Sequence, residues 1–426
     1  MLARNANEAL QRNRLDDQME PDACVRRFHI HHPTPESMGV FILNAKNSEL
    51  CVLRDFFWNH IRGQKNKASI RFTPGNGGRT FSLTYHIPSF VLRTVDLLRD
   101  DLPEDCRKRT DRSPWRKSRK LSFLCTDMQP DAQIVDILHK TQHSFTVYGY
   151  NKSIWTSNYP IDTYFYKHDP DNPDTVGFYV DDPNDEEDAD ADAEVWDPST
   201  IGTLEAHKVV LDPCDYFLIV LLERYKQWYE EWMNTFTIIQ RRISIYFETH
   251  TATMVTVPTS KESARKALTY IEKSRQWLKQ TEELLELLTR TLRAIITSWN
   301  VFKQDDRVYF PKNRGIWSSH QQIVNKVKEL ADVLEGFLDL KDRCRHFGKN
   351  LELDIGVQSG PVISLQYLNV TFYFDIREGE YGWIKPENTV NVDEGGFMAG
   401  FGLDCLAIGS SDPKRKAFHK GSQSRA

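Results

Sequence analysis

Apolar side chains recur every three or four positions from residue 212 to about residue 350. At the start of the first run, Pro213 follows Asp212, a pair that favours the beginning of a helix. The apolar positions of this run are Phe217, Leu221, Tyr225, Trp228, Trp232, Phe236, Ile239, Ile243 and Tyr246. Because their spacing averages about 3.6 residues, the pattern predicts one long amphipathic helix.

Two further runs show the same period. One begins at the Thr259–Glu262 capping box and extends to about Phe302, and the next begins at the Ser319–Gln322 capping box and ends near Phe347. A capping box supplies partners for amide groups that the first turn of a helix leaves unpaired, so it marks a helix start. Residues 211–350 are therefore predicted to form three long antiparallel, stalk-like helices.

Short alternating runs of apolar and polar residues dominate positions 28–180 instead. In ASIRFTPGNGGRTFSLTYHI (68–87), two such runs flank the glycine-rich segment 74–78, which predicts a β-hairpin. The glycines do not indicate a phosphate loop, because no Lys-Ser/Thr follows and the next segment is a strand. The predicted fold class is α/β (α+β), with a mixed-sheet domain followed by the three helices.

Charge is concentrated in one stretch. Residues 181–194 carry nine carboxylates against a net charge of −5, so the rest of the chain is mildly basic, which argues against nucleic-acid binding. The candidate metal ligands are Asp181, Asp182, Asp185, Glu186, Glu187 and Asp188. Hard cations prefer carboxylate oxygens, but the stretch lacks an EF-hand pattern and apolar anchors. Within the linker 181–210, a solvated loop is preferred, loose cation attraction is the alternative, and an ordered metal site is least favoured.

Two other polar clusters have simple interpretations. The connector RDDLPEDCRKRTDRSPWRKSRK (99–120) has a basic half that could contact phosphates, but its mixed signs favour a solvated loop. In the cluster 29–32, His29 and His31 share one side of a predicted strand and form a possible metal pair. Because no cysteine or carboxylate lies beside them, a surface cluster is preferred.

The two ends of the chain and its cysteines indicate in which cellular compartment the protein lies and whether it spans a membrane. Seven scattered cysteines without a CxxC motif indicate reduced thiols and a cytoplasmic protein, and residues 1–27 look like a flexible leader without a secretory signal. Segment 355–374 has no charge and is long enough to span a membrane, but its polar and β-branched residues favour strands. Residues 351–426 are therefore predicted to be irregular or strand-like, with a disordered basic tail.

No local motif nominates a catalytic residue, since GxSxG, HExxH and GxGxxG patterns are absent. A non-enzymatic protein is predicted. The aromatic residues Tyr225, Trp228, Tyr229 and Trp232 could offer a stacking platform for bases, and the candidates for packing or interaction are Tyr225, Trp228, Trp232 and Phe236. Their helical spacing on an apolar ladder favours core packing, with any exposed remainder available for helix–helix or subunit contact.

Several strings, taken in order, resemble the fungal branch of the CorA-like magnesium transporter family over residues 40–353. They are FSLTYHIPSFVLR (81–93), WRKSRKLSFL (115–124), WTSNYPIDTYFY (155–166), LDPCDYFLIVLLERYKQWYEEW (211–232), AIITSWNVFKQDDRVYF (294–310) and KDRCRHFGKNLEL (341–353). The resemblance implies a homopentameric cytoplasmic domain whose last long helix leads into the first of two membrane helices, with Mg²⁺ as the candidate ion.

The sequence departs from the family where ions are selected. The family's Gly-Met-Asn motif ends its first membrane helix, whereas here Gly348-Lys349-Asn350 has lysine in the middle and precedes any membrane-grade segment. The chain as written is expected not to conduct ions, and to meet a membrane only through another chain or if its C-terminus is a truncated reading. A role in divalent metal ion transport or its regulation is expected; a soluble interaction or scaffold protein that reuses the fold is the alternative.

Overall fold

The computed structural model describes most of residues 25–381. The described ranges are 25–63, 67–75, 78–96, 105, 107–109, 112–125, 134–164, 196–206, 210, 212–254, 261–305, 310 and 314–381. The chain divides into two compact units, of which the first comprises Met1–Thr253 and Lys273–Gly348 and the second Met254–Glu272 and Lys349–Ala426. The sheet belongs to the first unit, whereas the long helices of residues 261–305 and 314–381 each have a part in the second.

The sheet is mixed, as the sequence predicts. Its strands are β1 (Val25–His31), β2 (Lys67–Gly75), β3 (Gly78–Asp96), β4 (Ser118–Lys120), β5 (Ile134–Gly149) and β6 (Trp155–Ile161). The order is β1-β6-β5-β3-β2, and the short β4 also pairs with β5. Strands β1 and β6 are parallel, whereas the other neighbours are antiparallel.

The predicted hairpin is confirmed, because β2 and β3 pair in register from Lys67↔His86 to Gly75↔Gly78. The alternation in β3 separates two chemically different faces of the sheet. Leu83, Tyr85 and Ile87 are buried among apolar residues. Their neighbours Ser82, Thr84 and His86 point to the opposite face, since successive strand side chains alternate.

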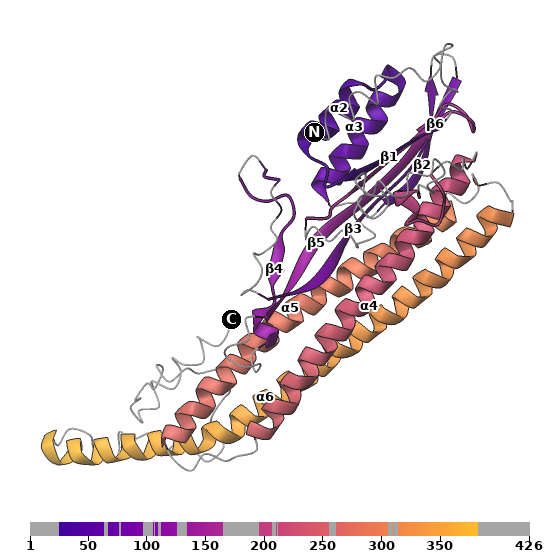
Figure 1. Cartoon of the computed structure of the whole chain (residues 1–426). Helices are drawn as coiled ribbons and strands as arrows, with labels where there is room; N and C mark the ends of the chain where they lie inside the picture. The colour runs from indigo at the N-terminus through magenta and orange to yellow at the C-terminus, as the bar shows by residue number, and fades with distance from the viewer. Residues whose placement is uncertain are drawn as a thin grey trace, which may run out of the picture. The chain divides into compact units, whose positions relative to one another are not determined.

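Helices α2 (Pro35–Leu43) and α3 (Asn47–Arg62) cover this second, more polar face (Figure 1). Thr34 caps α2, with its hydroxyl accepting from the Ser37 amide at 3.2 Å. Gly63 ends α3 in the left-handed region at φ 58°, where a side chain would be strained. A small apolar core joins the layers; it contains Ile30, Met38, Phe41, Leu53, Phe56, Phe57, Trp115 and Tyr148.

Three long helices cover the apolar face: α4 (Pro213–Met254), α5 (Lys261–Asp305) and α6 (Arg314–Tyr381) (Figure 1). Ring contacts tie them to the sheet and to each other. Trp228 of α4 lies edge-on to Tyr85 of β3, with ring centroids 6.2 Å apart, and Trp232 lies edge-on to Phe337 of α6 at 6.1 Å. The three predicted helices are thus confirmed, and the first unit has three layers.

The C-terminal part of the helical prediction was wrong. Helix α6 does not end near Phe347 but continues to Tyr381, so residues 351–381 are helical rather than strand-like. An existing helix extends without paying again for a nucleus, and β propensity is a weak, context-dependent preference. Within the described residues, no helix is both long enough and apolar enough to cross a membrane.

The N-terminal boundary also shifts. Strand β1 begins at Val25, inside the range 1–27 that the sequence assigns to a leader. Short 3₁₀ helices lie at Ser122–Cys125 and Pro198–Thr200. Residues 1–24, the predicted acidic loop up to residue 195 and residues 382–426 lie outside the described part of the chain.

Candidate functional site

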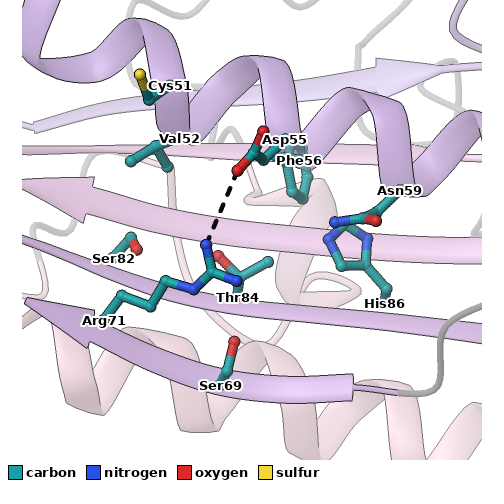
Figure 2. Close-up of a pocket in the computed structure, with 10 residues that line it drawn as sticks. All are labelled: Cys51, Val52, Asp55, Phe56, Asn59, Ser69, Arg71, Ser82, Thr84 and His86. Atoms are coloured by element: carbon teal, nitrogen blue, oxygen red, sulfur yellow. Dashed lines mark ion pairs between the residues drawn. The ribbon is translucent and has the colours of Figure 1, made fainter.

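A pocket of about 110 Å³ opens between α3 and the polar face of strands β2 and β3 (Figure 2). Helix α3 contributes one wall and the two strands contribute the other. The lining residues are Cys51, Val52, Asp55, Phe56, Asn59, Ser69, Arg71, Ser82, Thr84 and His86. The pocket therefore combines hydroxyls, an amide and an imidazole with one acidic and one basic side chain.

The charged pair of the pocket is solvent-accessible. Asp55 of α3 and Arg71 of β2 face each other with 3.9 Å between oxygen and nitrogen (Figure 2), and their side chains are 50% and 61% exposed. Arg54 also contacts Asp55, at 3.4 Å. Exposed pairs of this kind contribute roughly 0–1 kcal/mol, so a polar ligand can replace them at little cost.

Behind the pocket, a series of buried polar groups lies between α3 and the polar face of the sheet. The Ser144 hydroxyl lies 2.9 Å from His86 Nδ1 and 3.0 Å from His60 Nδ1. His60 Nε2 in turn lies 3.5 Å from Asp162 Oδ1. If His60 carries its proton on Nε2, facing Asp162, its Nδ1 accepts from Ser144, and His86 Nδ1–H donates to Ser144.

Asp162 belongs to a buried ion network with Asp105, Arg107 and Arg116. Arg116 Nε donates to Asp162 Oδ2 at 2.5 Å, and Arg107 Nη2 lies 2.8 Å from Asp162 Oδ1. Arg107 also binds both oxygens of Asp105, at 2.8 and 3.0 Å. Two carboxylates face two guanidinium groups, so the network is internally neutral.

Burial and these partners act in opposite directions on the titratable groups. Burial raises the pKa of Asp162, but Arg116 and Arg107 outweigh it and hold that pKa well below its usual range. Burial lowers the pKa of His60 to about 4 despite the nearby Asp162 carboxylate. At neutral pH the site therefore contains an ionised aspartate and a neutral histidine, as the hydrogen-bond directions above require.

Ser144, His60 and Asp162 have the order of a nucleophile, a base and an orienting acid. All three side chains are fully buried, however, and the Asp162 carboxylate is already neutralised by two arginines. A nucleophile must reach a substrate carbonyl or phosphorus atom, which Ser144 cannot do from this position. The arrangement can fix the orientations of His60 and His86 through Ser144, rather than attack a substrate.

Sequence reasoning missed this network and wrongly assigned its residues to a solvated connector. Asp105, Arg107 and Arg116 come from the segment 99–120, yet each is at most 5% exposed. Their partner Asp162 lies far along the chain, so no local pattern shows the pairing. Trp115 is the one feature of the segment that could have indicated burial. An aromatic side chain favours the interior, and Arg116 is its immediate neighbour in the sequence.

The histidines of β1 are half-buried rather than exposed as a surface cluster. The His29 ring lies 5.2 Å from the Tyr159 ring, His31 Nδ1 lies 3.2 Å from the Thr163 hydroxyl, and His32 Nε2 lies 3.8 Å from Asp105 Oδ1. Burial lowers the pKa of His32 to about 4. Among the described residues, no group of three or more potential ligands could hold a metal ion.

The other sequence-predicted residues have these positions. Tyr225, Trp228 and Trp232 are buried in the core between the sheet and the helices, and Phe236 packs against that core while partly exposed. The proposed cation ligands Asp181, Asp182, Asp185, Glu186, Glu187 and Asp188 lie outside the described residues. The structure thus brings together the aromatic set, whereas the acidic set stays a prediction from the sequence.

No protein-family model matches the chain, and no curated protein matches it.

Proposed function

We propose that the chain is a CorA-like cytoplasmic domain that takes part in divalent metal ion transport or its regulation, with magnesium as the ion. Two features support this proposal. The ordered sequence strings resemble the fungal CorA-like family, and the mixed-sheet domain is followed by long helices, an element order on which the resemblance also rests.

Helix α6 is the observation that carries the proposal. It has 68 residues, whereas an average helix in a globular protein has about 11–12. Only its residues up to Gly348 belong to the unit that contains the sheet, and the helix continues for a further 33 residues in the second unit, from 349 to 381. A long helix that extends beyond the domain it packs against is suited to connect that domain to another part of the protein or assembly.

A scaffold protein is the second candidate, and exposed aromatic residues favour it. Trp58 of α3 is 52% exposed and Trp317 of α6 is 55% exposed. Large apolar side chains in such positions are common at protein–protein contacts. Under this alternative, the chain assembles through these faces and the assembly is indifferent to magnesium.

Light scattering coupled to size-exclusion chromatography separates the two candidates. The full chain is measured without divalent ions, in a few millimolar magnesium chloride, and in sodium chloride of matched ionic strength. We expect a homopentamer whose mass or elution volume changes with magnesium and not with the sodium control. A monomer that ignores magnesium contradicts the transport proposal. A magnesium-independent oligomer that Trp58→Ser or Trp317→Ser weakens favours the scaffold.

A further inference from the structure

Five exposed basic residues of segment 99–120 lie beside the neutral ion network without being members of it. Lys108, Arg109, Arg112, Lys117 and Lys120 are exposed. The nearby carboxylates of Asp105 and Asp162 are fully buried and already accept from Arg107, Arg116 and backbone amides. Within the described residues, the carboxylates of the network therefore do not compensate the positive charges at its rim.

One of these cations, Lys117, is held opposite a further cation, Lys140 of β5. The Lys140 amide of β5 donates to the Lys117 carbonyl at 3.2 Å, which continues the antiparallel β4–β5 pairing in which Ser118 faces His139. Directly opposed residues of antiparallel strands project from the same face, and like charges at such positions repel. No ion pair holds either ammonium group within the described part of the chain.

Lys140 is only partly exposed, and is therefore less solvated than the five basic residues of the segment. Burial lowers its pKa, and the charges of Arg116, Arg109 and Lys117 lower it further, while Asp162 acts in the opposite direction. Arg109 stands nearby and donates from Nη2 to the Trp115 carbonyl at 3.3 Å, which uses one of the five N–H groups of its guanidinium. An anion placed here would relieve repulsion between cations that the fold itself holds together.

We propose that Lys117, Lys140 and Arg109 form a binding site for a phosphate group. Three cations at one place favour a ligand that carries about two negative charges and presents several oxygens. A phosphate meets both requirements, whereas a single carboxylate has one charge and two oxygens. The site is separate from the pocket between α3 and the sheet, and it does not depend on a role in magnesium transport.

Titration calorimetry of the full chain with inorganic pyrophosphate tests the site. We expect saturable binding that weakens as salt is raised, because charge attraction drives it. Lys140→Gln and Lys117→Gln should each weaken binding about tenfold or more, the effect of losing a hydrogen bond to a charged group. The absence of saturable heat with the wild-type chain would overturn the proposal.

Lys120→Gln is the matched control. Lys120 ends the same short strand but projects from the opposite face to Lys117, so the variant removes equal charge without touching the site. Its affinity for pyrophosphate should stay within about twofold of wild type. If Lys120→Gln weakens binding as much as Lys140→Gln does, the attraction is general to the basic surface and no site exists.

A stability measurement makes the test independent of failed folding. Without anion, Lys140→Gln should melt at the same temperature as wild type or higher, because it removes a repelled charge. Pyrophosphate should raise the melting temperature of wild type more than that of the variant. A clear fall in the melting temperature of the anion-free variant contradicts the repulsion on which the site rests.

Vesicles separate the two sources of a phosphate group. The chain is sedimented with phosphatidylcholine vesicles, with and without a phosphoinositide. Binding to the phosphoinositide that pyrophosphate and Lys140→Gln both reduce assigns the site to a lipid headgroup. Pyrophosphate binding without vesicle binding assigns it to a free phosphate compound, and binding to neither refutes the proposal.

Discussion

At the scale of single residues, the main feature is the burial of four charges and the neutral His60 beneath α3. Replacing one member of such a network leaves another charge buried without a partner, which costs several kcal/mol, even though the intact network adds little net stability. The arrangement therefore fixes geometry rather than supplying stability. It holds the end of α3, since Arg116 donates to the carbonyls of His60 and Ile61 at 2.7 and 2.8 Å.

His60 makes the stability of the domain depend on pH. Its pKa is about 4 in the folded chain and about 6.5 in the unfolded chain, so between these values the unfolded state binds more protons. The free energy of unfolding should therefore fall as the pH decreases from 6.5 towards 4. Urea denaturation of wild type and His60→Asn at pH 7 and pH 4.5 measures this contribution.

The loss between the two pH values should be smaller in His60→Asn by about 2 kcal/mol. The Asp162 carboxylate does not interfere in this window, because its pKa is held well below its usual range and its contribution is lost only at lower pH. An equal loss in both proteins would show that His60 does not carry the pH dependence.

At the scale of elements, the sequence pattern predicted those helices and strands whose formation depends mainly on neighbouring residues. The ladder from Phe217 to Tyr246 gave α4, because a helix buries one stripe of its surface whatever it packs against. The alternation from residue 81 to 87 gave β3 for the equivalent reason. The buried Arg107 and Arg116 were not predictable, since their burial depends on Asp162, which reaches them only in the folded sheet.

Contact between α4 and α6 gives a prediction at this scale. A Cβ at Gly336 of α6 would lie 2.8 Å from ring atoms of Phe236, a ring that packs edge-on against Phe337 at 5.2 Å. Gly336→Ala should therefore destabilise the protein by about 1–3 kcal/mol, despite the better helix propensity of alanine. Chemical denaturation provides the measurement.

Gly39 of α2 provides the matched control, because nothing lies within 4 Å of a Cβ built there. Gly39→Ala should raise the free energy of unfolding by up to about 1 kcal/mol. If Gly336→Ala is equally stabilising, Phe236 is free to move aside and does not fix the distance between α4 and α6.

At the scale of the first unit, the sheet separates two kinds of chemistry. Its face towards α4, α5 and α6 is apolar and aromatic, and forms a continuous core with those helices. Its face towards α2 and α3 carries the pocket, the histidines and the ion network. Substitutions that alter the binding of a ligand but leave the protein folded are therefore expected on the face of the sheet beneath α2 and α3.

The acidic segment gives a prediction for the whole chain. If magnesium acts on the folded domain, deletion of residues 181–194 should leave magnesium-dependent assembly unchanged, because a carboxylate run without the spacing of an EF-hand loop is expected to attract cations only loosely. Light scattering and magnesium calorimetry of the deletion variant and the full chain measure this. Loss of the magnesium heat on deletion would identify these carboxylates as the sensor.

The parallel pairing of β1 with β6 has a consequence for synthesis of the chain. Val25 pairs with Trp155, so the first strand must wait for a partner made 130 residues later. At typical translation rates this delay is on the order of 10 s, during which β1 has no place in the sheet. Such distant pairing also slows folding, since a long loop must close before the contact forms. The edge strand β1 is therefore the part of the sheet that a chaperone on the nascent chain would protect longest.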